Sequence, residues 1–273
     1  MAGMAGSSGL KVGQFYLRVR PGRAVRRALF QPCDNGIMNV TERPRAILFD
    51  LDDTLWPIAP VIAEAETTLH AWLATHAPKV AQAFSIEELR ARRMALLAAE
   101  PHYHLDLGKL RRAALEAAFA HAGEDLAHID GAMQHFFAAR NAVKPYDDVL
   151  PGLLHLADRL TLGAVTNGNA DLEVIGIAHH FKVALAASHF GKAKPDPAIF
   201  LAACDALGVA PRHAVYVGDD LRLDVEGAQK AGLRAVWMNR TGSNAHVELG
   251  IAPDAICSSF EELIAWLEQQ LSD

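Results

Sequence analysis

Three acidic side chains follow directly on a short apolar run early in the sequence. Residues 46–49 are all apolar, as in a strand buried on both faces, and Asp50, Asp52 and Asp53 come within the next four positions. In open parallel sheets, ligands bind beyond the carboxyl ends of the strands. Residues two apart in an extended chain point the same way, so Asp50 and Asp52 are expected to share one site.

Carboxylates crowded into one site repel one another, and burying them without partners is costly. A bound cation removes this repulsion, and oxygen ligands of this kind suit Mg²⁺, which takes a few carboxylates and keeps waters or substrate oxygens. The acidic stretch therefore favours a Mg²⁺ site at the end of the first strand. Taken alone, it is explained equally well by a solvated acidic turn.

Polar residues also stand where later apolar runs end. Thr166 and Asn167 follow one run, Asp219 follows another with Asp224 five residues on, and Lys194 lies between the two runs. Phosphoryl transfer needs an in-line nucleophile, neutralisation of the charge on the phosphoryl oxygens, and a proton for the leaving oxygen. One carboxylate can be the nucleophile and a second the general acid and base, while Mg²⁺, a lysine and a hydroxyl hold the phosphate. Each residue alone is explained by an ordinary turn or a solvated surface, but their order after successive strands favours one shared site.

Apolar runs alternate with helical patterns over the last 130 residues or so. The predicted strands are 46–49, 160–165, 183–187, 214–217, 233–238 and 255–257. The predicted helices are 147–159, 171–181, 197–207, 225–231 and 260–271. This alternation predicts an α/β fold whose parallel sheet is covered by helices on both faces.

A helical segment interrupts this pattern after the first strand. It is rich in Ala, Leu, Glu and Arg, and Ser85 with Glu88 forms a candidate capping box. We expect a bundle of about four helices there, at 61–76, 85–99, 107–122 and 125–141. The predicted parts are a flexible N-terminal tail (1–43), an α/β core (44–56 and 144–273) and the helical insert (57–143).

Composition and charge narrow the class of protein. An apolar content of 51% with 21% charged residues is typical of a globular chain, and no apolar run has the length of a membrane span. The first 45 residues carry a net charge of +6 and the rest carries −12, which disfavours nucleic-acid binding. Three distant cysteines, Cys33, Cys204 and Cys257, fit neither a zinc site nor a disulfide framework, so a cytoplasmic location is expected. Met38 is an alternative start, and both a monomer and a homodimer stay open.

Four ordered motifs resemble those of the haloacid dehalogenase superfamily, over about residues 44–270. They are Asp50-Leu51-Asp52-Asp53-Thr54-Leu55, Thr166-Asn167-Gly168, Lys194-Pro195-Asp196-Pro197 and Gly218-Asp219-Asp220-Leu221-Arg222-Leu223-Asp224. The resemblance implies a Rossmann-like α/β core with an inserted all-helical cap. It also implies a Mg²⁺-dependent phosphatase that passes through an aspartyl-phosphate.

The resemblance assigns roles position by position. Asp50 would be the nucleophile, and Asp52 the general acid and base. Thr166, Asn167 and Lys194 would bind the phosphate. The implied metal ligands are Asp50, the backbone carbonyl of Asp52, Asp219, and Asp224 directly or through water. Dehalogenases of the superfamily lack the second aspartate of the first motif, so Asp52 favours phosphate chemistry.

A narrower resemblance concerns the substrate. The runs 49–55, 166–170 and 217–221 look like those of a bacterial branch that dephosphorylates flavin mononucleotide and 5-amino-6-(5-phosphoribitylamino)uracil. The expected partner is therefore a small phosphorylated metabolite. Candidate specificity residues in the cap are Tyr103, His104, Asp106 and Arg111. The alternatives are a nucleotide or sugar-phosphate phosphatase, a phosphomutase, and a non-catalytic Mg²⁺-binding interaction module.

Overall fold

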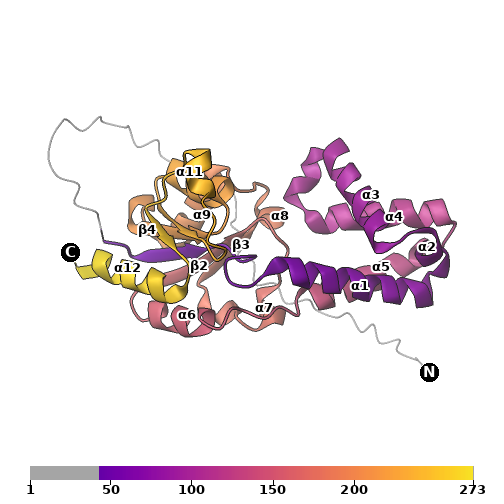
Figure 1. Ribbon diagram of the computed structural model, residues 1–273, viewed down its shortest axis with the longest axis horizontal. Coiled ribbons are helices and arrows are strands. Elements are labelled where there is room, and N and C mark those ends of the chain that lie inside the picture. Colours follow the sequence, from indigo (N-terminus) through magenta and orange to yellow (C-terminus); the bar gives the residue numbers. More distant parts are fainter. Residues whose placement is uncertain (1–42, 273) are drawn as a thin grey trace, which may run out of the picture.

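A six-stranded sheet forms the centre of the core (Figure 1). The computed structural model of the chain describes residues 43–272, so the predicted tail lies outside the described residues, apart from its last position. The strand order is β3-β2-β1-β4-β5-β6, and every neighbouring pair is parallel. The strands are β1 (Ala46–Phe49), β2 (Thr161–Thr166), β3 (Val183–Ala186), β4 (Ala214–Gly218), β5 (Arg234–Met238) and β6 (Ala255–Cys257). The six predicted strands are confirmed, each end within one residue.

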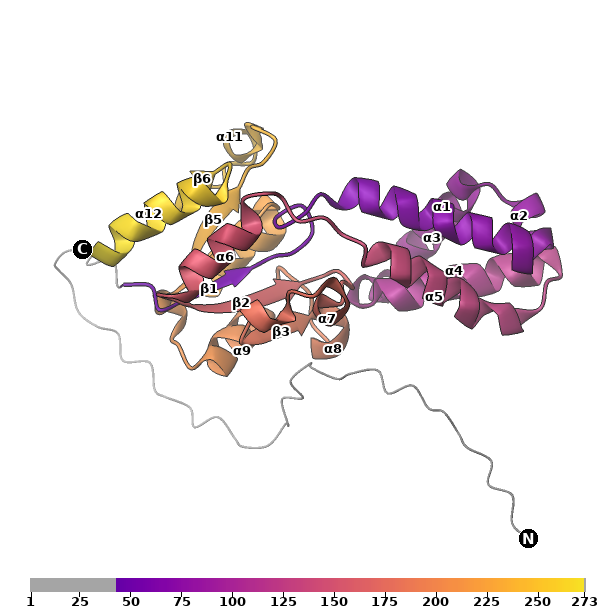
Figure 2. The same ribbon diagram turned by 90° about the horizontal axis from the view of Figure 1, so that it is seen from below.

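The sheet is covered by helices on both faces (Figure 2). Ile47 and Phe49 of β1 belong to one hydrophobic cluster, whereas Ala46 and Leu48 belong to another on the opposite face. This is why the apolar run shows no alternation: both faces of the central strand are buried. The helices on the first face are α6 (Val149–Ala157) and α12 (Phe260–Ser272), and those on the second are α9 (Pro197–Leu207) and α10 (Gly227–Lys230).

Two predicted helices of the core have different bounds in the structure. The one at 171–181 is wrong beyond Ile175, because α7 (Leu172–Ile175) ends at Gly176, whose φ of 87° is the left-handed conformation of a helix C-terminus. The one at 225–231 begins earlier, as a π-helical turn, η5 (Leu221–Glu226), that continues into α10. The sequence prediction also missed two short helices, α8 (Ala187–Phe190) and α11 (Ala245–Leu249).

The helical cap stands between β1 and β2 in the chain, as predicted. Its helices are α1 (Ile58–His76), α2 (Pro78–Ala83), α3 (Ile86–Ala99), α4 (Leu107–Ala122) and α5 (Ile129–Arg140), with short 3-10 turns η1 (Pro101–Leu105) and η2 (Leu126–His128). The capping box of Ser85 and Glu88 is confirmed. The prediction of about four helices missed α2, which is only six residues long, and the helix expected at 125–141 starts as the turn η2.

The cap has its own hydrophobic cluster, in which α1, α2, α4 and α5 meet. It lies to one side of the core, and the chain passes between the two lobes twice, once before α1 and once after α5 (Figures 1 and 2). Cys204 and Cys257 are buried free thiols, whereas Cys33 lies outside the described residues. No helix within residues 43–272 combines the length and apolar character needed to cross a membrane.

Candidate active site

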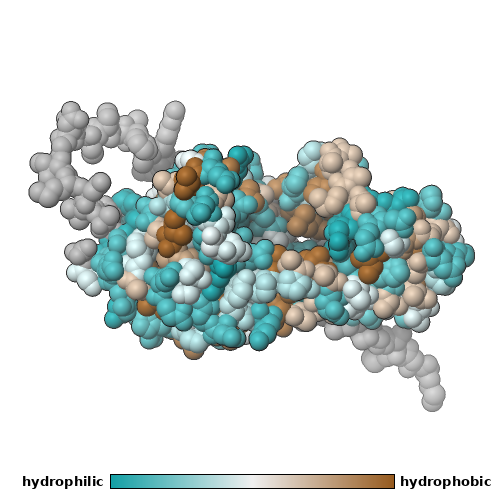
Figure 3. Space-filling model, in the orientation of Figure 1, coloured by the Kyte–Doolittle hydropathy of each residue, from teal (hydrophilic) through white to brown (hydrophobic). Residues whose placement is uncertain are grey.

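The chemistry-bearing residues meet at the carboxyl ends of three neighbouring strands. β1 lies between β2 and β4. The strands β2 and β3 are added on one side of β1 and the strands β4 to β6 on the other, so β1 and β4 flank the topological switch point, where ligands bind in open α/β sheets. The surface is hollowed where the core faces the cap (Figure 3), and a cleft of about 240 Å³ lies there. Its lining comprises Asp50, Asp52, Asp53, Leu107, Thr166, Asn167, Gly168, Lys194, Asp219, Asp220, Leu223 and Asp224.

A tight turn after β1 brings the first motif into the cleft. Asp53 has a φ of 57°, a left-handed conformation that aspartate tolerates better than most residues. Its amide donates to the Trp56 carbonyl at 2.7 Å, and its carboxylate accepts from the Ile58 amide at 2.9 Å. The turn places the Trp56 indole against Asp52, with Nε1 donating to Oδ1 at 2.8 Å.

Lys194 is buried at the centre of the carboxylates. Its Nζ lies 2.6 Å from Oδ1 of Asp50, 2.6 Å from Oδ1 of Asp224, and donates to the Tyr216 hydroxyl at 3.0 Å. Burial alone lowers the pKa of Lys194, but Asp224 and Asp50 outweigh burial and raise it above its ordinary value. The lysine is therefore charged at neutral pH and offsets part of the negative charge around it.

Three carboxylates form a group with the spacing of a cation site. Oxygens of Asp50, Asp219 and Asp224 lie within 4.8 Å of one another. Burial raises the pKa of Asp50 well above its usual range, and Asp224 and Asp219 raise it further against the opposing effect of Lys194. Burial, with Asp224 and Asp53, also raises the pKa of Asp219 to about 7. One lysine is thus too little positive charge for this group, and the all-oxygen donor set fits Mg²⁺.

The side chain of Asp52 is outside that carboxylate group, so a contribution of Asp52 to a metal is limited to its backbone carbonyl. Thr166 lines the same cleft, and its hydroxyl accepts a bond from the Gly168 amide at 2.9 Å. Asn167 is engaged differently. Its Oδ1 accepts from the Lys194 amide at 2.8 Å and its Nδ2 donates to the Lys194 carbonyl at 3.0 Å. The Asn167 side chain therefore fixes the segment that carries the lysine.

The sequence prediction missed Arg140, which reaches Asp52 from the cap side. This residue ends α5, is only 1% exposed, and its Nη2 donates to Oδ1 of Asp52 at 2.8 Å and to Oδ2 at 2.7 Å. The residue gave no signal in the sequence, because a basic residue in the last turn of a helix is favoured by the helix dipole alone.

The predicted specificity residues are not placed together. Asp106 caps α4, accepting from the Lys109 amide at 2.9 Å. Tyr103 and His104 lie in the neighbouring turn η1. Leu107 is the one residue of this stretch that lines the described cleft. Tyr103, whose ring centroid lies 4.2 Å from that of His102, and His104 are not among the residues that line the cleft.

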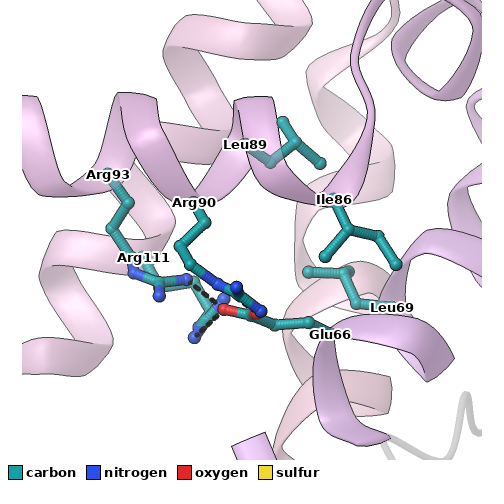
Figure 4. A pocket seen from close by; sticks show the side chains of 7 residues that line it. All are labelled: Glu66, Leu69, Ile86, Leu89, Arg90, Arg93 and Arg111. Atoms are coloured by element: carbon teal, nitrogen blue, oxygen red, sulfur yellow. Dashed lines mark hydrogen bonds and ion pairs between the residues drawn. The ribbon is translucent and has the colours of Figure 1, made fainter. Parts of the chain in front are cut away.

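Arg111 points into the cap instead. Its guanidinium stacks 3.4 Å above the Phe136 ring and lies 3.6 Å from the Glu66 carboxylate. Figure 4 shows Arg90, Arg93 and Arg111 converging on Glu66. Nη2 of Arg90 lies 2.5 Å from Oε2 of Glu66, and Nη1 of Arg93 lies 2.8 Å from Oε1. Burial, with Arg93 nearby, lowers the pKa of Arg111 to about 9. The sequence prediction that Arg111 contacts the substrate has no support in this geometry, because Arg111 joins α4 to α1 and α5.

Replacing Glu66 with glutamine should destabilise the cap, because three guanidinium groups lose their common carboxylate. Arg90 is half-exposed and can be solvated, so we expect a loss of about 2 kcal/mol in the free energy of unfolding at pH 7. Burial raises the pKa of Glu66, but bonds from Arg90 and Arg93 lower it below the ordinary 4.5. The carboxylate therefore stabilises the fold above about pH 4.5, and this advantage over glutamine fades as the pH falls further. Urea unfolding at pH 7 and pH 4, with the exposed Glu64→Gln as control, measures both effects.

The motif-bearing region matches a known family. The model of haloacid dehalogenase-like hydrolases matches residues 44–232, and the chain belongs to this family. Among its relatives, YigB of Escherichia coli (strain K12), a 5-amino-6-(5-phospho-D-ribitylamino)uracil phosphatase, is 34% identical over 200 residues, which cover 72% of this chain and 84% of the relative. A glyceraldehyde 3-phosphate phosphatase of Methanopyrus kandleri is also 34% identical, over 210 residues with the same coverages.

A solved structure described as a 2-haloacid dehalogenase from Pseudomonas syringae pv. Tomato DC3000 has the same fold. Its TM-score is 0.76 at 39% identity, and the match covers 83% of this chain and 99% of that one. The resemblance inferred from the four motifs is confirmed. The chain is a phosphatase of the haloacid dehalogenase-like family.

Proposed function

We propose that this phosphatase is Mg²⁺-dependent and works through an aspartyl-phosphate on Asp50. The observation that carries the proposal is the arrangement around this residue. Asp50 lies in a cleft, beside Lys194 and in the same carboxylate group as Asp219 and Asp224. These three carboxylates would hold the ion, which when bound neutralises charge on the phosphoryl oxygens.

The residues of the chain divide the reaction into two steps. In the first, an Asp50 oxygen attacks phosphorus while the bond to the leaving oxygen breaks and Asp52 gives that oxygen a proton. In the second, Asp52 takes a proton from water, and the water oxygen displaces Asp50 to release inorganic phosphate. Thr166 and Lys194 hold the phosphoryl oxygens throughout, and the Asn167 side chain keeps Lys194 in place.

Asp52 also separates this proposal from dehalogenation, the activity named for the Pseudomonas structure. A halide is a stable anion and leaves without a proton, whereas an alkoxide leaving group needs one. A carboxylate held by Trp56 and Arg140 at the edge of the cleft therefore has a use in ester hydrolysis that it lacks in halide release. The experiment that distinguishes the two activities compares phosphate release from p-nitrophenyl phosphate, with and without Mg²⁺, with halide release from 2-chloropropionate.

For the substrate, we propose flavin mononucleotide or 5-amino-6-(5-phosphoribitylamino)uracil. The proposal rests on the 34% identity to the Escherichia coli phosphatase and on the aromatic and polar residues Tyr103 and His104 in the turn that precedes Leu107 of the cleft. A panel of phosphorylated metabolites, ranked by kcat/KM, tests it. The panel includes glyceraldehyde 3-phosphate, nucleotides and sugar phosphates. Conversion of one sugar phosphate into its isomer would indicate a phosphomutase, and turnover of none would favour a binding module.

Asp52→Asn should reduce kcat/KM most for substrates whose leaving oxygen needs a proton. An alkyl phosphate such as flavin mononucleotide is expected to lose on the order of 10³-fold in kcat/KM, whereas p-nitrophenyl phosphate, whose leaving oxygen is a stable phenolate, loses much less in the first step. Burst-phase kinetics with p-nitrophenyl phosphate should show the second step slowed, because its water lacks a base. Equal losses on both substrates would assign Asp52 a structural role only.

A further inference from the structure

The acid/base carboxylate is held from both connections between core and cap. Trp56, on the connection that enters the cap, donates to Oδ1 of Asp52. Arg140, at the end of the last cap helix, donates to both oxygens. Asp52 is thus bonded both to the segment that enters the cap and to the end of the last cap helix.

The two oxygens of Asp52 are not equivalent. Oδ1 accepts two bonds, from Trp56 and Arg140, whereas Oδ2 accepts one, from Arg140. Oδ2 faces the phosphate-binding turn: a Cβ atom on Gly168 would lie 2.6 Å from Oδ2, 3.2 Å from the Thr166 hydroxyl and 3.6 Å from Nη2 of Arg140. The donors on Oδ1 therefore leave Oδ2 as the oxygen directed towards a phosphate held by Thr166.

Arg140 is itself fixed to the core. Its Nε donates to Oδ1 of Asn169 at 3.2 Å, and the next residue, Asn141, accepts from the Asp171 amide at 2.9 Å. Nη1 of Arg140 is buried and has no hydrogen-bond partner among the described residues. Burying a guanidinium almost fully with one nitrogen unpaired costs free energy of folding. A contact that only joined the two lobes would not need this cost, so the bonds to Asp52 call for a functional explanation.

We propose that Arg140 is a positioning residue, which holds Asp52 with Oδ2 towards the phosphate. The inference rests on the proposed function. Two other roles make different predictions: a purely structural tie between the lobes, and a direct contact of Arg140 with the substrate phosphate.

Leaving-group dependence distinguishes these roles. With Arg140→Gln, we expect kcat/KM for flavin mononucleotide to fall on the order of 10²-fold, and that for p-nitrophenyl phosphate by less than about tenfold. In an Asp52→Asn background, the same substitution should change flavin mononucleotide turnover by no more than about threefold, because the group it positions is already inactive. Competitive inhibition by inorganic phosphate should stay within about threefold of the parent enzyme, since Arg140 does not bind the phosphate.

Controls make each outcome informative. Arg112→Gln, which breaks an ion pair with Asp130 on the cap surface, should leave all rates unchanged. Thermal unfolding checks that the variants fold, and Arg140→Met, an apolar side chain of similar length, takes the place of Arg140→Gln if that variant does not. Parallel losses on both substrates, or a full loss in the Asp52→Asn background, would overturn the proposal. Failure of the proposed function is separate, because the parent enzyme then shows no Mg²⁺-dependent phosphate release.

Discussion

Replacing Asp50 with asparagine should abolish phosphate release while leaving the fold intact. An amide is a poor nucleophile and a poor ligand for Mg²⁺, so kcat with p-nitrophenyl phosphate is expected to fall on the order of 10⁴-fold or more. The fold should tolerate the change because the two side chains have the same shape. In the absence of Mg²⁺, burial raises the pKa of Asp50 well above its usual range, so ionisation of this carboxyl works against folding at neutral pH. The neutral amide removes that penalty.

Two measurements on the Asp50→Asn variant check this reasoning. Without Mg²⁺, its unfolding temperature should match or exceed that of the parent protein. Added Mg²⁺ should stabilise the parent protein much more than the variant, since ligand binding to the folded state raises stability. Asp205→Asn, the same change on an exposed part of α9, controls for the substitution itself. Substantial residual turnover by Asp50→Asn would contradict the assignment of the nucleophile.

The sheet could be predicted because its signals are local. A strand buried on both faces has an unbroken apolar sequence, and each of the six apolar runs forms a strand in the structure. The core motifs could be found for a related reason. In a parallel sheet, the residues at the carboxyl ends of the strands fall at the same edge, so Asp50, Thr166 and Asp219 are brought together by topology without any knowledge of side-chain packing.

Contacts between distant segments could not be predicted in this way. Arg140 and Asp52 are separated by 88 residues, and their pairing depends on how α5 returns to the core. The structural roles of Arg111 and Asp106 could not be predicted from the sequence either. Both lie in a polar stretch that suggested substrate contacts, but one is buried against Phe136 and the other caps a helix. Local sequence shows which side chains can do chemistry, whereas packing decides which of them face the cleft.

Gly218→Ala should be nearly as damaging as loss of the nucleophile, although a methyl group carries no chemistry. Asp224 lies directly over the α-carbon of Gly218, and a Cβ there would come within 2.3 Å of Oδ2 and 2.4 Å of the carboxyl carbon. Asp224 has little room to yield. It is 1% exposed, with Oδ1 bonded to Lys194 at 2.6 Å and Oδ2 accepting from the Asp220 amide at 3.0 Å.

The added methyl group must therefore displace either the end of β4 or the π-helical turn that carries Asp224. Either movement separates the three carboxylates that would hold Mg²⁺, so we expect kcat/KM for p-nitrophenyl phosphate to fall on the order of 10³-fold, with a higher Mg²⁺ concentration needed for half-maximal activity. Gly208→Ala is the matched control: no atom lies within 4 Å of its Cβ position, but its φ of 73° strains any side chain. That variant should lose about 1 kcal/mol of stability and no activity. Normal activity and Mg²⁺ dependence in Gly218→Ala would mean that Asp224 is free to move and is not a fixed part of the site.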